Sequence, residues 1–308
     1  MSEIQYLTIL KKSFSVSWKN KFWWLFGFLI FLGAAVEKLN LYKENFLINT
    51  GLGQYFNQGG KEAISMSLLL LVIILVFFYV LRILSSIALI RAINNPVLYK
   101  QLKYTAVFFE ARNFLGRLAG LDCLLDFTGV VIFLALLTPI ALLFSLKAVL
   151  LGTIVSFVAF LILAPLLILI FFLKKFSFMA LVLADLKVRE ALEIAYEIFL
   201  KQLKQSLLMG LSVLTTGLGV LLLLILIVLP LTAVNLFVPI VLWPAGVVVF
   251  VGLGLIFLIS LVFSVYIVFV QVVWLNFFSE IAMQKSKNSE PGKEKVVEEN
   301  EILSPDVA

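Results

Sequence analysis

The stretch Val149–Lys175 reads VLLGTIVSFVAFLILAPLLILIFFLKK, in which 25 consecutive residues without charge precede two lysines. A helix that crosses the hydrocarbon core of a bilayer, roughly 30 Å thick, needs about 20 mostly apolar residues. The segment is therefore long enough to span a membrane, and the lysine pair marks one of its ends.

The composition of the whole chain supports the same environment. Of 308 residues, 63% are hydrophobic and only 14% are charged, whereas an ordinary soluble domain has about 25% charged residues. The polar residues are too few to cover the surface of a soluble protein of this size. Lipid must therefore surround much of the surface. We predict an all-α polytopic membrane protein with a membrane domain at residues 1–283 and no large soluble domain.

Six segments are apolar and long enough, or nearly long enough, to be spans. The first is short, and we expect the turn Val16–Trp18 to extend it. The second should continue as a helix to Ile93, and the turn Ser145–Lys147 should make a tight hairpin of the third and fourth. The predicted spans are Phe22–Val36, Ala63–Leu81, Leu118–Leu146, Val149–Leu173, Ser206–Val234 and Gly246–Phe278.

The distribution of lysine and arginine supports six spans. With this map, nineteen of the 24 basic residues fall on one side of the membrane. The four on the other side are Lys38, Lys43, Lys61 and Lys147, and Arg82 lies near a span end. Because basic residues collect on the cytoplasmic side, we predict a multi-pass membrane protein with both termini in the cytoplasm. Met1–Lys21 lacks a leading apolar core and a cleavage site, so we expect the first span to be retained.

Amphipathic helices are predicted before several spans. In Asp185–Lys204, helical spacing gathers apolar residues on one face, namely Val188, Leu192, Ala195, Tyr196, Phe199 and Leu203. Glu197 precedes Lys201 by four residues, which predicts an ion pair on the other face. Such a helix should lie in the membrane interface.

Two other segments have a related pattern. Leu7, Phe14 and Trp18 recur at helical spacing near the N-terminus, and Leu98–Leu118 has a weaker period. The layout predicts three copies of one unit, an amphipathic cytoplasmic helix followed by two spans. The alternative is that juxtamembrane helices are common and arose independently. The polar tail Gln284–Ala308 should be disordered.

Three ionisable residues near span ends are candidates for function, because charge inside a membrane is costly. Asp122 and Asp126 are four residues apart and so share a helix face. Arg82, on the preceding span, should lie at a similar depth and pair with either aspartate, fixing spans two and three together. A structural lock or an interfacial anchor is the simpler role, and a proton or ion path is the alternative.

Small and polar residues in spans five and six form a second candidate set. Small residues allow helices to approach closely, and hydroxyl groups hydrogen-bond between helices. We predict a helix-packing face, with a substrate path as the alternative. The set consists of Gly217, Gly219, Gly252, Gly254, Ser260, Ser264 and Gln271.

Enzyme chemistry finds little support in the sequence. The chain has no histidine, which excludes histidine acid–base catalysis, Ser-His triads and histidine metal sites. An intramembrane aspartyl protease needs carboxylates from two helices, whereas Asp122 and Asp126 share one. The single cysteine, Cys123, lies in an apolar run and is expected to be a small buried hydrophobe. We predict no catalytic residue, cofactor, metal or nucleic-acid partner; the expected partners are membrane lipids, other proteins or further copies of the chain.

The segment 182–200, VLADLKVREALEIAYEIFL, continues as KQLKQSLLMGL. With Ser13-Phe14 and Trp24-Leu25-Phe26-Gly27, it resembles the bacterial multi-span membrane domain fused to some glycerophosphodiester phosphodiesterases and also found alone. Glu190-Ala191-Leu192 and Lys201 match the motif of that domain. Because the catalytic barrel with its essential histidines is absent, the resemblance implies a membrane domain of unknown role. With this resemblance, we expect a non-enzymatic protein of a bacterial inner membrane that organises lipids or partner proteins; a small transporter or permease subunit is the alternative.

Overall fold

The computed structural model describes residues 5–39, 60–96, 104–237 and 245–289. Within these ranges it contains eight helices and no strand, so the all-α prediction is confirmed. The helices are α1 (Tyr6–Lys19), α2 (Trp23–Leu39), α5 (Gly60–Asn94), α7 (Tyr104–Ser145), α8 (Val149–Ala184), α9 (Val188–Lys201), α10 (Leu203–Phe237) and α11 (Ala245–Ser289).

Five of these helices are long and apolar enough to cross a bilayer, namely α5, α7, α8, α10 and α11. The described apolar part of α2, Trp23–Val36, is shorter. The chain is therefore a multi-pass membrane protein. As predicted, the second apolar segment continues as one helix past Ile93, and a tight turn at Leu146–Ala148 joins α7 to α8.

Three boundaries differ from the predictions. The turn Val16–Trp18 does not extend the first span, because α1 ends at Lys19 and the amide side chain of Asn20 donates to the Val16 carbonyl at 2.8 Å. The third amphipathic segment is not a separate helix, since α7 runs unbroken from Tyr104 to Ser145. Helix α11 continues to Ser289, inside the segment expected to be disordered; residues 290–308 lie outside the described part.

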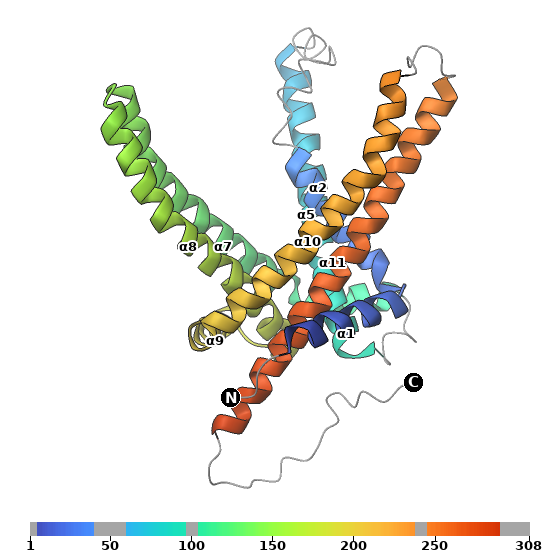
Figure 1. Ribbon diagram of the computed structural model, residues 1–308, viewed down its shortest axis with the longest axis vertical. Coiled ribbons are helices and arrows are strands. Elements are labelled where there is room, and N and C mark those ends of the chain that lie inside the picture. The colour runs from blue at the N-terminus through green and yellow to red at the C-terminus, as the bar shows by residue number, and fades with distance from the viewer. Residues whose placement is uncertain (1–4, 40–59, 97–103, 238–244, 290–308) are drawn as a thin grey trace.

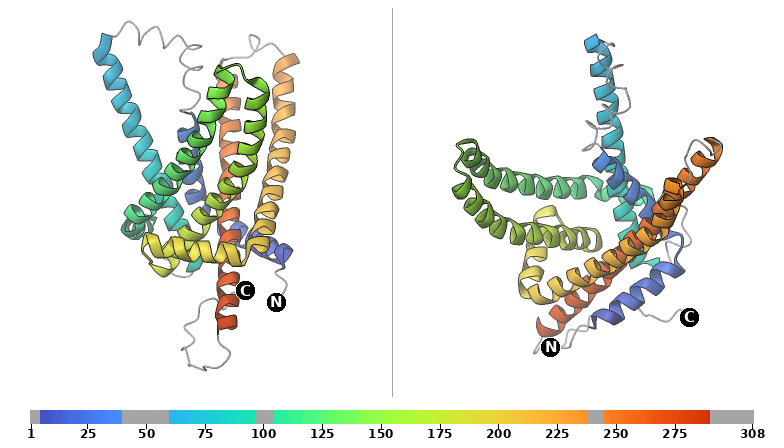
Figure 2. Two further views of the ribbon diagram at one scale, coloured as in Figure 1. Left: turned by 90° about the vertical axis from the view of Figure 1, so that its left-hand side faces the viewer. Right: turned by 45° about the horizontal axis from the view of Figure 1, so that its top comes forward.

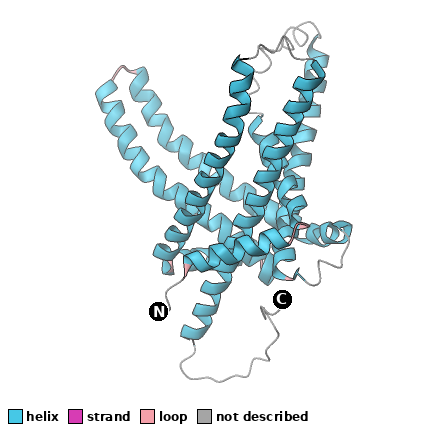
Figure 3. Cartoon of the chain, turned by 45° about the vertical axis from the view of Figure 1, so that its right-hand side comes forward, coloured by secondary structure: helices cyan, strands magenta, loops and turns pink. Residues whose placement is uncertain are grey.

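The helices form three antiparallel pairs that diverge from a common end of the molecule (Figure 1). We call the pairs α2–α5, α7–α8 and α10–α11 the arms. Helices α1 and α9 lie across the end where the arms converge, which we call the base (Figures 2 and 3). Two of the three predicted units thus have a separate helix at the base before a hairpin.

The buried core lies in the base. The buried apolar residues of α7 recur at helical spacing and stop at Leu125, namely Val107, Ala111, Phe114, Leu118, Leu121 and Leu125. No residue between Asp126 and Ser145 is buried. Between Asp126 and Ser145 the half-exposed residues recur at helical spacing on one narrow face, as Ile132, Leu136 and Ile140 do, and the others are exposed. Most of the circumference of this part of α7 therefore faces outward.

Helix α9 packs on the base through a face that overlaps the predicted one. It buries Ala195 and Phe199, as predicted, together with Ala191 and Ile198, whereas the predicted members Tyr196 and Leu203 are exposed. The buried face is therefore rotated toward Ala191 and Ile198. The predicted ion pair is confirmed, with Lys201 Nζ 2.6 Å from Glu197 Oε1.

Helix α1 buries Ile9 and two serines and exposes its aromatic residues Phe14 and Trp18. Ser13 and Ser17 are buried, and the Asn276 side chain of α11 donates to Ser13 Oγ at 3.0 Å. The exposed Phe14 and Trp18 rings contact rings of the neighbouring spans α11 and α2. The aromatic face therefore points along the spans, as expected for a helix that lies in a membrane interface.

Candidate functional site

A group of charged side chains joins α5, α7 and α8 where the α7–α8 arm leaves the base. Arg82 Nη2 of α5 lies 2.9 Å from Asp122 Oδ2 of α7. Lys174 Nζ of α8 lies 2.6 Å from Asp122 Oδ1 and 2.7 Å from Asp126 Oδ1. The Tyr79 hydroxyl donates to Asp122 Oδ2 at 3.2 Å. We call these five residues the ionic cluster.

Asp122 is the centre of the ionic cluster. Its side chain is only 2% exposed, and both of its carboxylate oxygens are occupied by donors from neighbouring helices. The guanidinium of Arg82 lies 5.3 Å from the centre of the Tyr79 ring, within the range of a cation–π contact. A buried carboxylate needs this degree of compensation, because an unpaired charge is costly in an apolar environment.

The structure brings all three predicted residues to the same place. Arg82 contacts Asp122, and Asp126, whose side chain is 57% exposed, is held by Lys174 instead. The sequence analysis missed Tyr79 and Lys174. Counting equal lengths from the turn at Ser145–Lys147 places Lys174 opposite Leu118, one helical turn further into the base than Asp122, so the hairpin alone does not identify this partner.

The tilt of the Lys174 side chain explains how one lysine on α8 contacts two carboxylates on α7. Side chains on a helix tilt toward its N-terminus, and the N-terminus of α8 lies at the outer end of the arm. Lys174 therefore reaches outward past Asp122 to Asp126, one turn away on α7. The arrangement can fix α8 and α5 to α7. Among the described residues, no group of three or more acidic, cysteine or histidine side chains could hold a metal ion.

The second predicted set does not form one packing face. Gly219, Gly252 and Gly254 have open space where a Cβ would stand, so within the chain they are not packing positions. A Cβ at Gly217 would lie 2.5 Å from the Tyr266 hydroxyl, so Gly217 does face α11.

The remaining members lie in the inner part of α11. Ser260 and Ser264 are buried, and the Ser264 hydroxyl donates to the Trp24 carbonyl of α2. Gln271 is half-buried. Ser264 therefore lies at a helix contact, between α11 and α2, as a packing residue should.

The close helix contacts involve glycines that the sequence analysis did not select. A Cβ at Gly27 would collide with the Ser264 backbone carbonyl of α11. A Cβ at Gly33 would lie 2.7 Å from the Cβ of Arg82 on α5. Gly27 and Gly33 therefore allow α2 to pack closely between α11 and α5.

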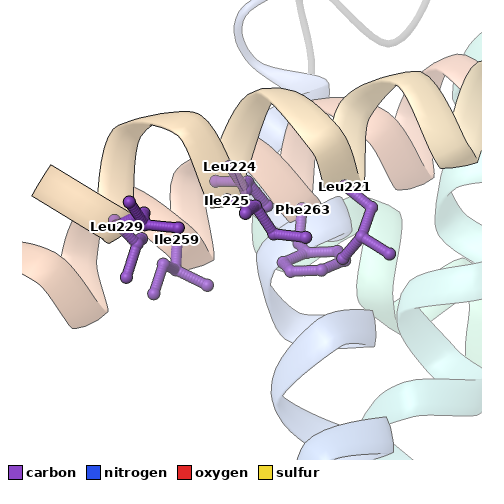
Figure 4. Close-up of a pocket in the computed structure, with 7 residues that line it drawn as sticks. Leu221, Leu224, Ile225, Leu229, Ile259 and Phe263 are labelled. Atoms are coloured by element: carbon purple, nitrogen blue, oxygen red, sulfur yellow. The ribbon is translucent and has the colours of Figure 1, made fainter. Parts of the chain in front are cut away.

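The grooves between the helices are apolar. One groove of about 380 Å³ between α10 and α11 is lined by Leu221, Leu224, Ile225, Val228, Leu229, Ile259 and Phe263 (Figure 4). Because the lining side chains are all apolar, they can contact hydrocarbon chains but cannot form hydrogen bonds with a polar substrate. Cys123, expected to be buried, is exposed on α7 beside the buried Asp122.

No family model, curated protein or solved structure matches this chain. The resemblance to the phosphodiesterase-associated membrane domain therefore stays a prediction. The function has to be argued from the arms, the base and the ionic cluster.

Proposed function

We propose that the chain is a non-enzymatic, six-span protein of a bacterial inner membrane that organises lipids around its arms. The observation that supports this most directly is the exposure of the arms. In the most apolar part of α7 no residue is buried, and in that of α8 only 6% are. Helices with so little protein contact need lipid or a partner to cover their side chains.

The base supplies the rigidity that such a role requires. The ionic cluster holds α5, α7 and α8 at their inner ends, and α1 and α9 brace the base from the side. In this proposal the base faces the cytoplasm, where most of the lysine and arginine residues lie. Lipid tails then fill the space between the outer parts of the arms, as the apolar groove between α10 and α11 allows.

A small transporter or permease subunit is the second candidate, and the ionic cluster is the observation that favours it. Charged residues in spans mark ion and proton paths in many transporters. However, the grooves between α10 and α11 and between α2 and α11 have mostly apolar linings, and donors occupy both oxygens of Asp122. These features fit a structural lock better than a path.

The six-span topology makes a direct prediction for labelling. In a Cys123→Ala background, Ser145→Cys places a thiol at the exposed turn between α7 and α8, and Lys204→Cys places one at the base. A membrane-impermeant maleimide should label position 145 in spheroplasts of intact cells and position 204 only after the membrane is opened. Labelling of both positions in intact spheroplasts would contradict the topology.

Lipid coverage of the arms makes a second prediction. In vesicles that contain phospholipids with photoreactive acyl chains, crosslinks should form around α7, at Phe133 and Leu134 as well as at Thr128 and Val131, exposed positions that together cover more than half of the helix circumference. Mass spectrometry of the peptides would locate them. If crosslinks occur on one face only and a second protein co-purifies in equal amount from native membranes, the arm is a protein-binding surface and the proposal is wrong.

A further inference from the structure

A groove between α2 and α11 leads to the base where α1 lies against α11 (Figure 1). Its volume is about 150 Å³, and it is lined by Trp24, Phe28, Phe257, Ser260, Leu261 and Ser264. The Ser260 hydroxyl donates to the Ile256 carbonyl at 2.7 Å. The Ser264 hydroxyl donates to the Trp24 carbonyl. Because both hydroxyl protons are used within the protein, the groove is suited to a hydrocarbon chain and not to a polar ligand.

Trp24 lies at the inner end of this groove and connects it to α1. Its indole Nε1 donates to the Ser17 carbonyl of α1 at 3.0 Å, which fixes the ring. The ring centre lies 5.4 Å from that of the exposed Trp18, and Trp18 in turn stacks on Phe14. A row of aromatic rings therefore leads from the groove to the surface of α1, as expected at the headgroup level of a membrane.

Lys21 lies one helical turn closer to the base than Trp24. The Trp24 backbone N–H donates to the Lys21 carbonyl at 3.1 Å. Spacings of three and seven residues place Lys21, Trp24 and Phe28 on one side of the chain as it enters α2. Lys21 is exposed, so a basic residue continues the wall of the groove into the membrane interface.

The charge at this end of the groove is positive. Residues 5–36 contain four lysines and no acidic residue. Helix α9, on the other side of the base, carries three glutamates, and two of them pair with its basic residues Arg189 and Lys201. Because an excess of basic residues near the membrane surface attracts anionic headgroups, the α1 side of the base is the better place for an anionic lipid.

We propose that the groove between α2 and α11 holds an acyl chain of an anionic phospholipid whose phosphate group binds Lys21. Lysine ammonium groups are common phosphate ligands, and tryptophan favours the interface between headgroup and hydrocarbon. From the base outward, Lys21, Trp24 and the apolar groove follow in the order of phosphate, glycerol and acyl chain in a phospholipid. This inference rests on the proposed function, since it names the class of lipid and one place where the protein holds it.

The test is native mass spectrometry of the full chain in detergent, with phosphatidylglycerol and phosphatidylcholine of identical acyl chains as probes. We expect one phosphatidylglycerol to bind more tightly than phosphatidylcholine. Lys21→Met should weaken phosphatidylglycerol about fivefold, the factor that one lysine near a headgroup contributes, and Lys21→Arg should retain it. Lys12→Met is the matched control with unchanged affinity, because Lys12 is exposed on the side of α1 away from Phe14.

A second pair of variants tests the groove itself. Leu261→Trp places a larger side chain in the groove and should weaken both lipids by a similar factor, because it takes the space of the acyl chain. Leu258→Trp is the control, since Leu258 is exposed on the same helix but does not line this groove, and it should weaken neither lipid. Circular dichroism establishes that each variant keeps its helices.

Equal affinities of the unmodified chain for the two lipids would overturn the proposal. An equal loss in Lys12→Met and Lys21→Met would do so as well, because it would show a non-specific surface effect. Unchanged binding in a folded Leu261→Trp would exclude the groove, and if that variant unfolds, the lysine variants still decide. Failure of this site with crosslinks around α7 would leave the proposed function standing, whereas crosslinks on one face of α7 would refute that function separately.

Discussion

Replacing Asp122 with asparagine is expected to destabilise the protein by about 3–5 kcal/mol, the usual cost of breaking a buried ion pair. The change keeps the shape of the side chain and removes its charge. Arg82 and Lys174, whose side chains are only 22% and 26% exposed, would then lose their shared carboxylate. The measurement is the free energy of unfolding of the purified protein in mixed micelles of a mild detergent and dodecyl sulfate.

Asp126 provides the matched control on the same helix face. Its side chain is more than half exposed and has a single partner, Lys174, so Asp126→Asn should cost about 0–1 kcal/mol, as for exposed ion pairs. Equal losses in the two variants would show that Asp122 is not the centre of the ionic cluster.

A charge exchange distinguishes this three-helix cluster from a simple pair. If Arg82 and Asp122 interacted only with each other, Arg82→Asp with Asp122→Arg would restore much of the lost stability. Because Lys174 Nζ lies 2.6 Å from Asp122 Oδ1, the introduced arginine would face a second cation. We therefore expect recovery only when Lys174→Met is added to the exchange; full recovery in the double variant would contradict a role of Lys174.

The spans could be predicted from the sequence because lipid exposure is a property of each segment by itself. An uncharged run such as Val149–Leu173 has no stable place in water, whatever the rest of the chain does. Helices α5 and α8 continue beyond their apolar segments into the base, and where they end is harder to predict from the sequence of the segment alone. Their last turns are held by tertiary contacts, as at Phe176 and Met179, which are fully buried against other helices.

The candidate site was predictable only in part, because its contacts also join helices that are far apart in the sequence. The cost of charge in a membrane identifies Arg82 and Asp122 as residues that need partners, without identifying the partners. Lys174 was read as a topology signal, since basic residues at span ends are common. The glycines show the same limit: Gly254 and Gly27 both lie in apolar helices, yet only Gly27 meets another backbone. Which face of a helix is covered depends on how the arms diverge, and no local pattern encodes that.

Replacing Gly27 with alanine is expected to cost about 1–3 kcal/mol, the usual range for overpacking. The added Cβ would occupy the position of the Ser264 backbone carbonyl, and backbone cannot move aside as a flexible side chain can. Separation of α2 from α11 would also break the hydrogen bond from Ser264 to the Trp24 carbonyl. The free energy of unfolding in mixed micelles measures the effect, and Gly252→Ala and Gly254→Ala, where space is open, should lie within about 0.5 kcal/mol of the unmodified chain.

The close packing of α2 explains how so short an apolar helix can hold its place among longer ones. Its 17 residues span only about 26 Å at 1.5 Å per residue, less than the hydrocarbon thickness of roughly 30 Å. Gly27 allows α2 to contact α11 and Gly33 allows it to contact α5 beside Arg82, so α2 is held at close range both by its partner helix α5 and by α11 of a second arm. Gly33→Ala should therefore shift Arg82 and weaken the ionic cluster, and its cost should be non-additive with that of Asp122→Asn. Strict additivity in a double-mutant cycle would show that α2 packing and the ionic cluster are independent.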